Sequence, residues 1–122
     1  RWSGTMRNEE APESLPEATE QAVKLLGFAA RSRRIVCGAG QVIAQITSRT
    51  PPTVAVIASD ASERTLKQLT DKCRSHGVRA VRTKLTGAEL ADLLGKGGAT
   101  MAAAPTDQSI ASEIVRLTFG DK

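Results

Sequence analysis

Residues 53–58, Thr-Val-Ala-Val-Ile-Ala, are the stretch that decides the fold class. Such an apolar run predicts a strand that is covered on both faces, like the central strand of a parallel sheet. Helical patterns flank this strand on both sides, because apolar residues recur there at spacings of three and four. A buried strand between two amphipathic helices indicates an α/β protein.

Further elements follow this strand towards the C-terminus. A helix is expected to begin at Asp60 with Glu63 and to end at His76-Gly77, where glycine suits the position after a helix. The remaining elements are a strand over 78–83, a helix begun by the capping box of Thr86 and Glu89, a strand over 99–104, and a last helix opened by Pro105 and Thr106.

Three elements precede the central strand. Residues 17–31 carry the apolar stripe of an amphipathic helix, with Ser14 and Glu17 as its capping box. Residues 34–37 form a short strand, and a helix after Gly38 ends at residues 50–52, because the residue before a proline is disfavoured in a helix. Five helices that alternate with four strands predict a three-layer α/β/α sandwich with a mostly parallel four-stranded sheet.

Length and composition fit one globular domain. The chain has 122 residues, and its aromatic content of 2% requires an aliphatic core. Residues 1–20 hold two arginines and five glutamates, whereas the rest of the chain holds 15 basic and 8 acidic residues. Residues 1–16 contain almost no aliphatic side chains to bury, so we expect a flexible acidic leader or linker there. Residues 17–122 are expected to form a single, clearly basic domain.

Several classes of protein are disfavoured by the same data. No run of roughly 18 apolar residues suggests a membrane span, and the start of the chain does not resemble a secretory signal. The two cysteines are too few for a disulfide framework and lack the paired spacing of a zinc site. A cytoplasmic protein is expected.

Catalytic chemistry has little support in the sequence. His76, the only histidine, falls at a predicted helix end, where a helix-terminal role is expected. Cys37 and Cys73 fall within predicted elements, where small buried hydrophobes are expected. No serine sits in a glycine-flanked nucleophile elbow, and no cluster of acidic residues and histidine has metal-ligand spacing. We therefore expect no enzyme.

Nucleotide-binding and phosphoryl-acceptor sites are also disfavoured by the sequence. Gly38-Ala39-Gly40 follows a strand, but Ile43 stands where a dinucleotide fingerprint needs its third glycine. The glycine-rich residues 95–98 follow a helix and precede a strand, the reverse of a P-loop. Asp60 lies where a phospho-receiver would carry its acceptor, yet no carboxylate follows the first strand to hold magnesium. Asp60 is better interpreted as a helix cap.

The glycine turn at residues 38–40 suits a polyanion instead. Glycines at a helix start let a phosphate approach the free backbone N–H groups. Three arginines just upstream could bind phosphates in bidentate fashion, although they could equally be a solvated helix end. These residues are Arg31, Arg33 and Arg34. Together with the basic domain, they favour RNA as the partner.

Three stretches carry a resemblance to a known family. They are LLGFAARSRRIVCGAGQVIAQI (25–46), TVAVIASDASERTLKQLTDKC (53–73) and TGAELADLLGKGGATMAAAPTDQSIASEIV (86–115). In this order they resemble the kink-turn RNA-binding family of archaeal and eukaryotic ribosomal proteins, in particular its bacterial YlxQ-like branch. The resemblance implies an α/β/α sandwich that binds structured RNA, for example ribosomal RNA, without a cofactor or metal.

The resemblance also implies where the RNA would be bound. It places contacts on the glycine turn with the start of the second helix, on the loop before the last strand, and at the end of the central strand. The corresponding residues are Gly38, Ala39, Gly40 and Gln41; Gly95, Lys96, Gly97, Gly98 and Ala99; and Asp60 with Ala61.

Strong kink-turn binders of this family carry an Asn-Glu pair and a lysine that read sheared G·A pairs. The matching positions here are Gly40, Gln41 and Ala44. A protein-interaction or adaptor module that has lost kink-turn specificity is therefore the alternative. In some relatives of this branch the domain follows a YlxR-type nucleic-acid-binding domain. The acidic residues 1–20 and the absence of a methionine at position 1 fit such an excised C-terminal domain, and they fit a cloning remnant equally well.

Overall fold

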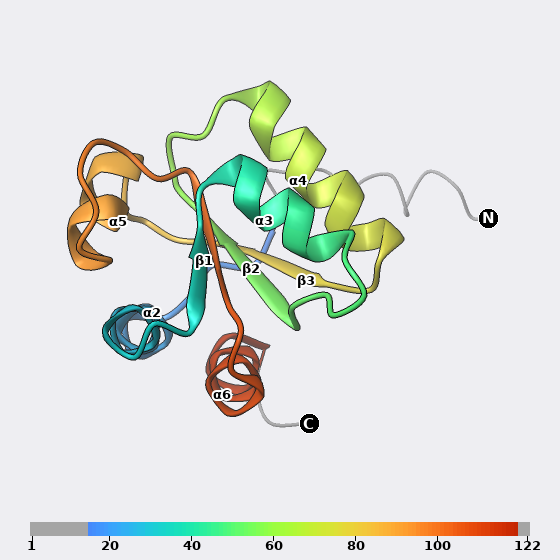
Figure 1. Cartoon of the computed structure of the whole chain (residues 1–122). Coiled ribbons are helices and arrows are strands. Elements are labelled where there is room, and N and C mark those ends of the chain that lie inside the picture. The colour runs from blue at the N-terminus through green and yellow to red at the C-terminus, as the bar shows by residue number, and fades with distance from the viewer. Residues whose placement is uncertain (1–14, 120–122) are drawn as a thin grey trace.

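Strands and helices alternate along the chain as the sequence predicts. The computed structural model describes residues 15–119 (Figure 1). In chain order, the elements are α2 (Glu20–Arg31), β1 (Ile35–Cys37), α3 (Ala39–Ile46), β2 (Val54–Ile57), α4 (Glu63–Ser75), β3 (Arg79–Arg82), α5 (Gly87–Leu93), β4 (Ala102–Pro105) and α6 (Gln108–Phe119).

The sheet is mixed, so the prediction of a mostly parallel sheet was wrong in this respect. The strand order is β1-β4-β2-β3, and β4 runs antiparallel to both of its neighbours. The reason lies in α5, which has seven residues and spans only about 10 Å. Helix α5 lies to one side of the sheet instead of running along a face, so it does not return the chain to the other end of the sheet, and β4 starts at the end where β2 and β3 finish.

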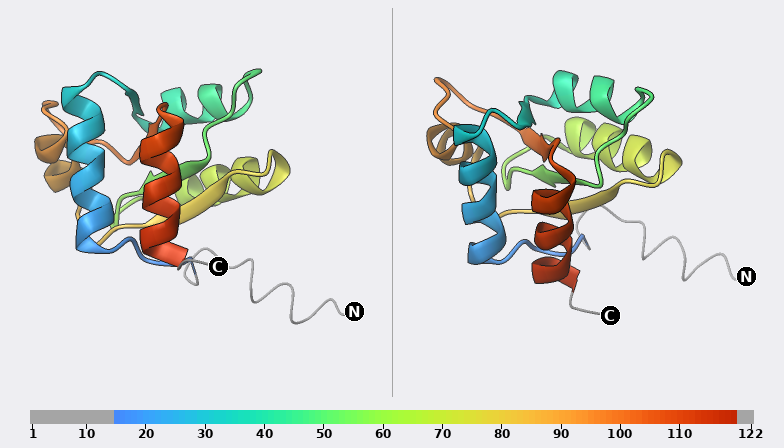
Figure 2. Two further views of the ribbon diagram at one scale, coloured as in Figure 1. Left: turned by 90° about the horizontal axis from the view of Figure 1, so that it is seen from below. Right: turned by 60° about the horizontal axis from the view of Figure 1, so that its bottom comes forward.

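Two helical layers cover the sheet, as predicted. α2 and α6 lie on one face, α3 and α4 lie on the other, and α5 lies to one side (Figures 1 and 2). Alternate residues of β2 supply the two cores: Val54 and Val56 face α2 and α6, whereas Ala55 and Ile57 face α3 and α4. The buried hydrophobic residues among those described are all aliphatic or cysteine, as the scarcity of aromatics requires.

Helix caps confirm one prediction and correct two. The capping box of Thr86 and Glu89 is present at the start of α5. The cap of α4 is Ser62, which accepts a hydrogen bond from the N–H of Thr65 at 3.1 Å, and not Asp60. α6 begins at Gln108 rather than at residue 105, because Pro105 still belongs to β4 and Asp107 accepts the N–H of Ile110.

The N-terminal end of the described region lies along β3. Pro16 O accepts a hydrogen bond from Arg82 N at 2.8 Å, and Ala18 N donates to Arg82 O at 2.7 Å. Thr19 then caps α2. Residues 1–14 of the predicted leader lie outside the described residues, and so does Ser14, which was predicted to form a capping box for this helix. No helix within residues 15–119 has both the length and the apolar character needed to cross a membrane.

Candidate nucleic-acid interface

Segments that are distant in the sequence meet at the end of the sheet where β1 and β2 finish. Gly38, directly after β1, donates its N–H to Ala102 O at 2.8 Å, and Ala58, after β2, donates to Met101 O at 2.8 Å. Both acceptors stand at the start of β4. The glycine turn and the loop that leads into β4 therefore meet, although more than 50 residues separate them in the sequence.

A shallow groove of about 490 Å³ lies between these two segments. Its walls include four of the predicted site residues: Gly38 and Gln41 at the start of α3, and Lys96 and Gly97 in the loop. Cys37 and Thr100 line it as well and were not predicted as site residues. Thr100 lies two residues before β4, and the pairing of β4 with β1 brings it here.

The N-terminus of α3 faces this groove without a side-chain cap. Its N-cap, Gly38, has φ of +99° and makes no side-chain hydrogen bond, whereas Thr19, Ser62, Thr86 and Asp107 cap the other four described helices. Within residues 15–119, the N–H groups of Ala39, Gly40 and Gln41 have no hydrogen-bond acceptor. Three donors at the positive end of a helix dipole are thus open to an anion.

Lys96 carries its positive charge on a loop whose backbone is anchored to α5. Gly95 has φ of +74°, and Lys96 N donates to Ala91 O at 2.8 Å, so this part of the loop is anchored on the end of α5. Burial raises the pKa of the Cys37 thiol, and the positive charge of Lys96 opposes that rise. Because its pKa is raised, the thiol lines the groove in its neutral form at pH 7.

Arg34 lies at the opposite end of β1 from the glycine turn. Its Nη1 atom is 2.5 Å from Asp107 Oδ2, and its carbonyl oxygen accepts a hydrogen bond from Thr106 N at 2.9 Å. The three residues of β1 lie between Arg34 and Gly38, so four steps of extended chain, about 13 Å, separate the two residues. The guanidinium of Arg34 therefore belongs to the contact between α2 and α6 and not to the groove.

Arg33 is the one described residue other than glycine with positive φ, at +61°. It stands just after the C-cap of α2, where its N–H donates to Ala30 O and the next N–H, of Arg34, donates to Ala29 O. This pair of bonds is the Schellman motif, which glycine normally completes. Both bonds recur at the end of α5, where Gly95 takes this position, and the longer bond, from Val78 N to Cys73 O, recurs at the end of α4, where Gly77 also has positive φ. An arginine there costs about 1 kcal/mol of backbone strain.

Asp60 and Ala61 stand at the same edge of the sheet, just after β2. The Oδ1 atom of Asp60 accepts a hydrogen bond from Gly87 N at 2.7 Å, which links the end of β2 to the start of α5. Ala61 packs against the core under α3 and α4. Asp60 thus positions α5, and through α5 it positions the loop that carries Lys96.

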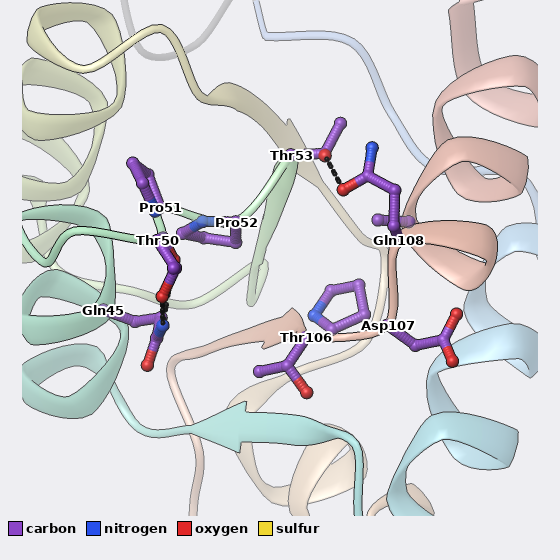
Figure 3. A pocket seen from close by; sticks show the side chains of 10 residues that line it. Gln45, Thr50, Pro51, Pro52, Thr53, Thr106, Asp107 and Gln108 are labelled. Atoms are coloured by element: carbon purple, nitrogen blue, oxygen red, sulfur yellow. Dashed lines mark hydrogen bonds between the residues drawn. The ribbon is translucent and has the colours of Figure 1, made fainter.

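A second hollow, of about 160 Å³, lies at the opposite edge of the sheet (Figure 3). Its polar groups largely bond one another: Gln45 donates to Thr50 O at 3.0 Å, and Thr53 donates to Gln108 Oε1 at 3.2 Å. Asp107, on its rim, is already paired with Arg34. We therefore interpret this hollow as a packing contact between the segment before β2 and the segment that joins β4 to α6, and not as a binding site.

The described residues offer little for covalent or metal chemistry. No cluster of three or more histidine, cysteine, aspartate or glutamate residues within 15–119 could hold a metal ion. Burial raises the pKa of the Cys73 thiol to about 12. His76 lies at the C-cap of α4, with Nδ1 3.1 Å from Lys72 O, at the helix end predicted for it.

The fold is that of a known family of α/β proteins. Residues 20–115 match the ribosomal protein L7Ae/L30e/S12e/Gadd45 family, and the chain belongs to that family. It is 36% identical over 93 residues to the RNA-binding protein YlxQ of Bacillus subtilis (strain 168), a match that covers 76% of this chain and 90% of YlxQ. The resemblance inferred from the three sequence stretches is thereby confirmed.

Solved structures agree with this assignment. A protein of unknown function from Bacillus halodurans has a TM-score of 0.70 and 27% identity, with 81% of this chain and 97% of that chain covered. The 15.5kD RNA binding protein of Giardia lamblia also has a TM-score of 0.70, with 23% identity and coverage of 82% and 89%. The second likeness supports the fold alone.

Proposed function

We propose that this protein binds structured RNA in the groove between the glycine turn and the loop of residues 95–98. One observation carries the proposal: the uncapped start of α3 and Lys96 line the same groove. The relative YlxQ is named for RNA binding, which supports RNA over other polyanions.

Both backbone and side-chain groups of the groove would contact the RNA. The N–H groups of Ala39, Gly40 and Gln41 would donate to a phosphate, and Lys96 would neutralise its charge. Gln41 is exposed at the rim, where its amide can both donate to and accept from a base edge. Binding of this kind needs no cofactor and no chemical step, so we infer a non-enzymatic protein of the cytoplasm that acts on structured RNA, such as ribosomal RNA.

Kink-turn specificity is the finer part of the proposal. Gly40, Gln41 and Ala44 occupy the positions at which strong kink-turn binders carry Asn, Glu and Lys, and only Gln41 keeps a polar side chain. We infer that the backbone donors of the turn and Gln41 together recognise the bend, with less help from side chains than in strong binders.

The test is a titration of the protein, at one physiological salt concentration, with a kink-turn RNA and with the same RNA carrying broken G·A pairs. We expect tight binding to the first RNA and a loss of at least tenfold with the second. Equal, salt-sensitive binding to both would leave a general RNA-backbone binder and remove the kink-turn part. Absence of binding to either RNA would overturn the proposal in favour of a protein-interaction module.

A further inference from the structure

Phe28 is exposed on the outer face of α2. Half of its surface is open to solvent, and it is the exposed large hydrophobic residue among those described. The core side of this helix is formed by Ala22, Leu26 and Ala29, so Phe28 points away from the sheet. A single exposed aromatic residue is ordinary on a protein surface, and its neighbours decide whether it has a role.

Two cations flank Phe28 on the same helix face. Lys24 lies four residues before it and Arg31 three residues after it, spacings that place side chains next to one another on a helix surface. Neither cation makes an ion pair or side-chain hydrogen bond with another residue in the range 15–119. The acidic residue of this helix, Glu20, is in its first turn. The aromatic ring thus sits between two available positive charges.

This surface is continuous with the proposed RNA groove. A β-carbon built on Gly27 would lie 3.2 Å from Leu93 Cδ1 and 3.6 Å from Arg31 Nη1, so the guanidinium of Arg31 lies at the contact between α2 and α5. α5 ends at Leu93 and leads through Gly95 to Lys96, which lines the groove. Figures 1 and 2 show α5 beside α2. One RNA could therefore reach both surfaces.

We propose that Phe28, Lys24 and Arg31 form a second contact for the same RNA, on which an unpaired base stacks. This inference rests on the proposed RNA binding in the groove. An aromatic ring accepts any base on its face, and flanking cations attract the phosphates on either side of the stacked nucleotide. Unpaired bases are the part of a structured RNA that can be splayed out onto such a ring.

The test compares Phe28→Leu with Phe28→Trp on the kink-turn RNA used in the titration. Loss of stacking should weaken binding about tenfold in Phe28→Leu, and Phe28→Trp should stay within about twofold of the native protein. The salt dependence of binding should not change in Phe28→Leu, because no charge is removed. Thermal unfolding of both variants confirms that the exposed substitutions leave the fold intact.

Tryptophan emission provides a second measurement, which would not change on RNA binding if residue 28 had only a structural role. Trp2 is the sole tryptophan of the chain, so Phe28→Trp is made in a Trp2→Phe background. Its emission should be quenched by the RNA, whereas a tryptophan introduced by Gln68→Trp, at an exposed position of α4, should not respond.

The outcomes separate this inference from the proposed function. Unchanged affinity in Phe28→Leu, or unchanged emission on binding in Phe28→Trp, would overturn the stacking contact while RNA binding in the groove stands. If the native protein binds no RNA, both proposals are overturned together.

Discussion

Arg34 and Asp107 form a hydrogen-bonded ion pair of 2.5 Å that ties the end of α2 to the start of α6. Asp107 also accepts the N–H of Ile110, so one carboxylate serves both as a helix cap and as the partner of an arginine. The hydrogen bond from Arg34, followed by that from Ile110 N–H, lowers the pKa of Asp107 below its usual range.

A lowered pKa in the folded protein makes stability depend on pH in one direction. The contribution of Asp107 is fully present above the pKa of an unfolded aspartate, about 4, and is lost as the pH falls through the lower folded value. Asp107→Asn keeps a residue suited to capping but removes the charge. We expect the unfolding temperature of this variant to lie below that of the native protein at pH 7, and the gap to close towards pH 2. A gap that is constant with pH would contradict this role.

Because its charge is paired away from the groove, Arg34 should matter for stability more than for RNA. Arg34→Ala should lower the unfolding temperature yet leave RNA affinity within about twofold, since the surface charge removed is already compensated by Asp107. Thermal unfolding and a binding titration measure the two effects on one sample. A loss of affinity as large as that of a groove variant would show that Arg34 leaves Asp107 to contact RNA.

Arg33 offers a test of backbone strain. Arg33→Gly should raise the free energy of unfolding by about 1 kcal/mol, because glycine adopts the left-handed conformation without penalty. Gly77→Ala, at the same position of the motif after α4, should lower it by a similar amount. Denaturant titration measures both, and a failure of Arg33→Gly to stabilise would show that the motif is not strained.

Arg33→Gly also tests whether the strained conformation of Arg33 serves RNA binding. Strained residues that persist are often functional. If the exposed side chain of Arg33 contacts a phosphate, Arg33→Gly should bind RNA more weakly, with a salt slope smaller by about one. Unchanged binding and slope would remove Arg33 from the candidate interface.

Lys96 is the groove residue whose removal should show most clearly in the salt dependence. Lys96→Ala should weaken binding to every RNA and reduce the slope of log affinity against log salt by about one. Lys72→Ala removes the same charge from the exposed last turn of α4 and serves as the control. Equal effects of the two variants would indicate attraction by net charge alone rather than binding in the groove.

A gain-of-function variant tests kink-turn recognition directly. Gly40→Asn, Gln41→Glu and Ala44→Lys together restore the side chains of strong kink-turn binders at three exposed positions of α3. A β-carbon on Gly40 meets no atom within 4 Å, so the fold has room for the change. We expect affinity for a kink-turn RNA to rise at least tenfold, with no gain for RNA lacking G·A pairs. An unchanged ratio between the two RNAs would argue against kink-turn binding at this helix.

Local patterns predicted most elements of the fold, because their causes are local. The capping box of Thr86 and Glu89 and the glycine after α4 each act within a few residues. The direction of β4 was not predictable in this way, since alternating helices and strands fit a parallel and a mixed sheet equally. Asp60 was misassigned for a related reason: its partner, Gly87, lies 27 positions away, and Ser62 was equally able to cap the helix.

The candidate site was predicted from sequence in its parts but not in its assembly. The residue patterns mark the glycine turn and the loop of residues 95–98 one by one, the family resemblance assigns both to RNA, and the pairing of β4 with β1 brings them into one groove. Arg34 was grouped with them because it is near in sequence. Its ion pair with Asp107 spans 73 positions, and no local pattern signals such a contact.

In the sheet of the described residues, β1 has one partner, and that partner is the last strand of the chain. During synthesis, residues 35–37 have no strand to pair with until residues 102–105 leave the ribosome. The glycine turn also depends on β4, because the N–H of Gly38 donates a hydrogen bond to Ala102 O. The groove is therefore among the last parts of the molecule to take shape, and a chain that stops before residue 102 lacks the strand that assembles it.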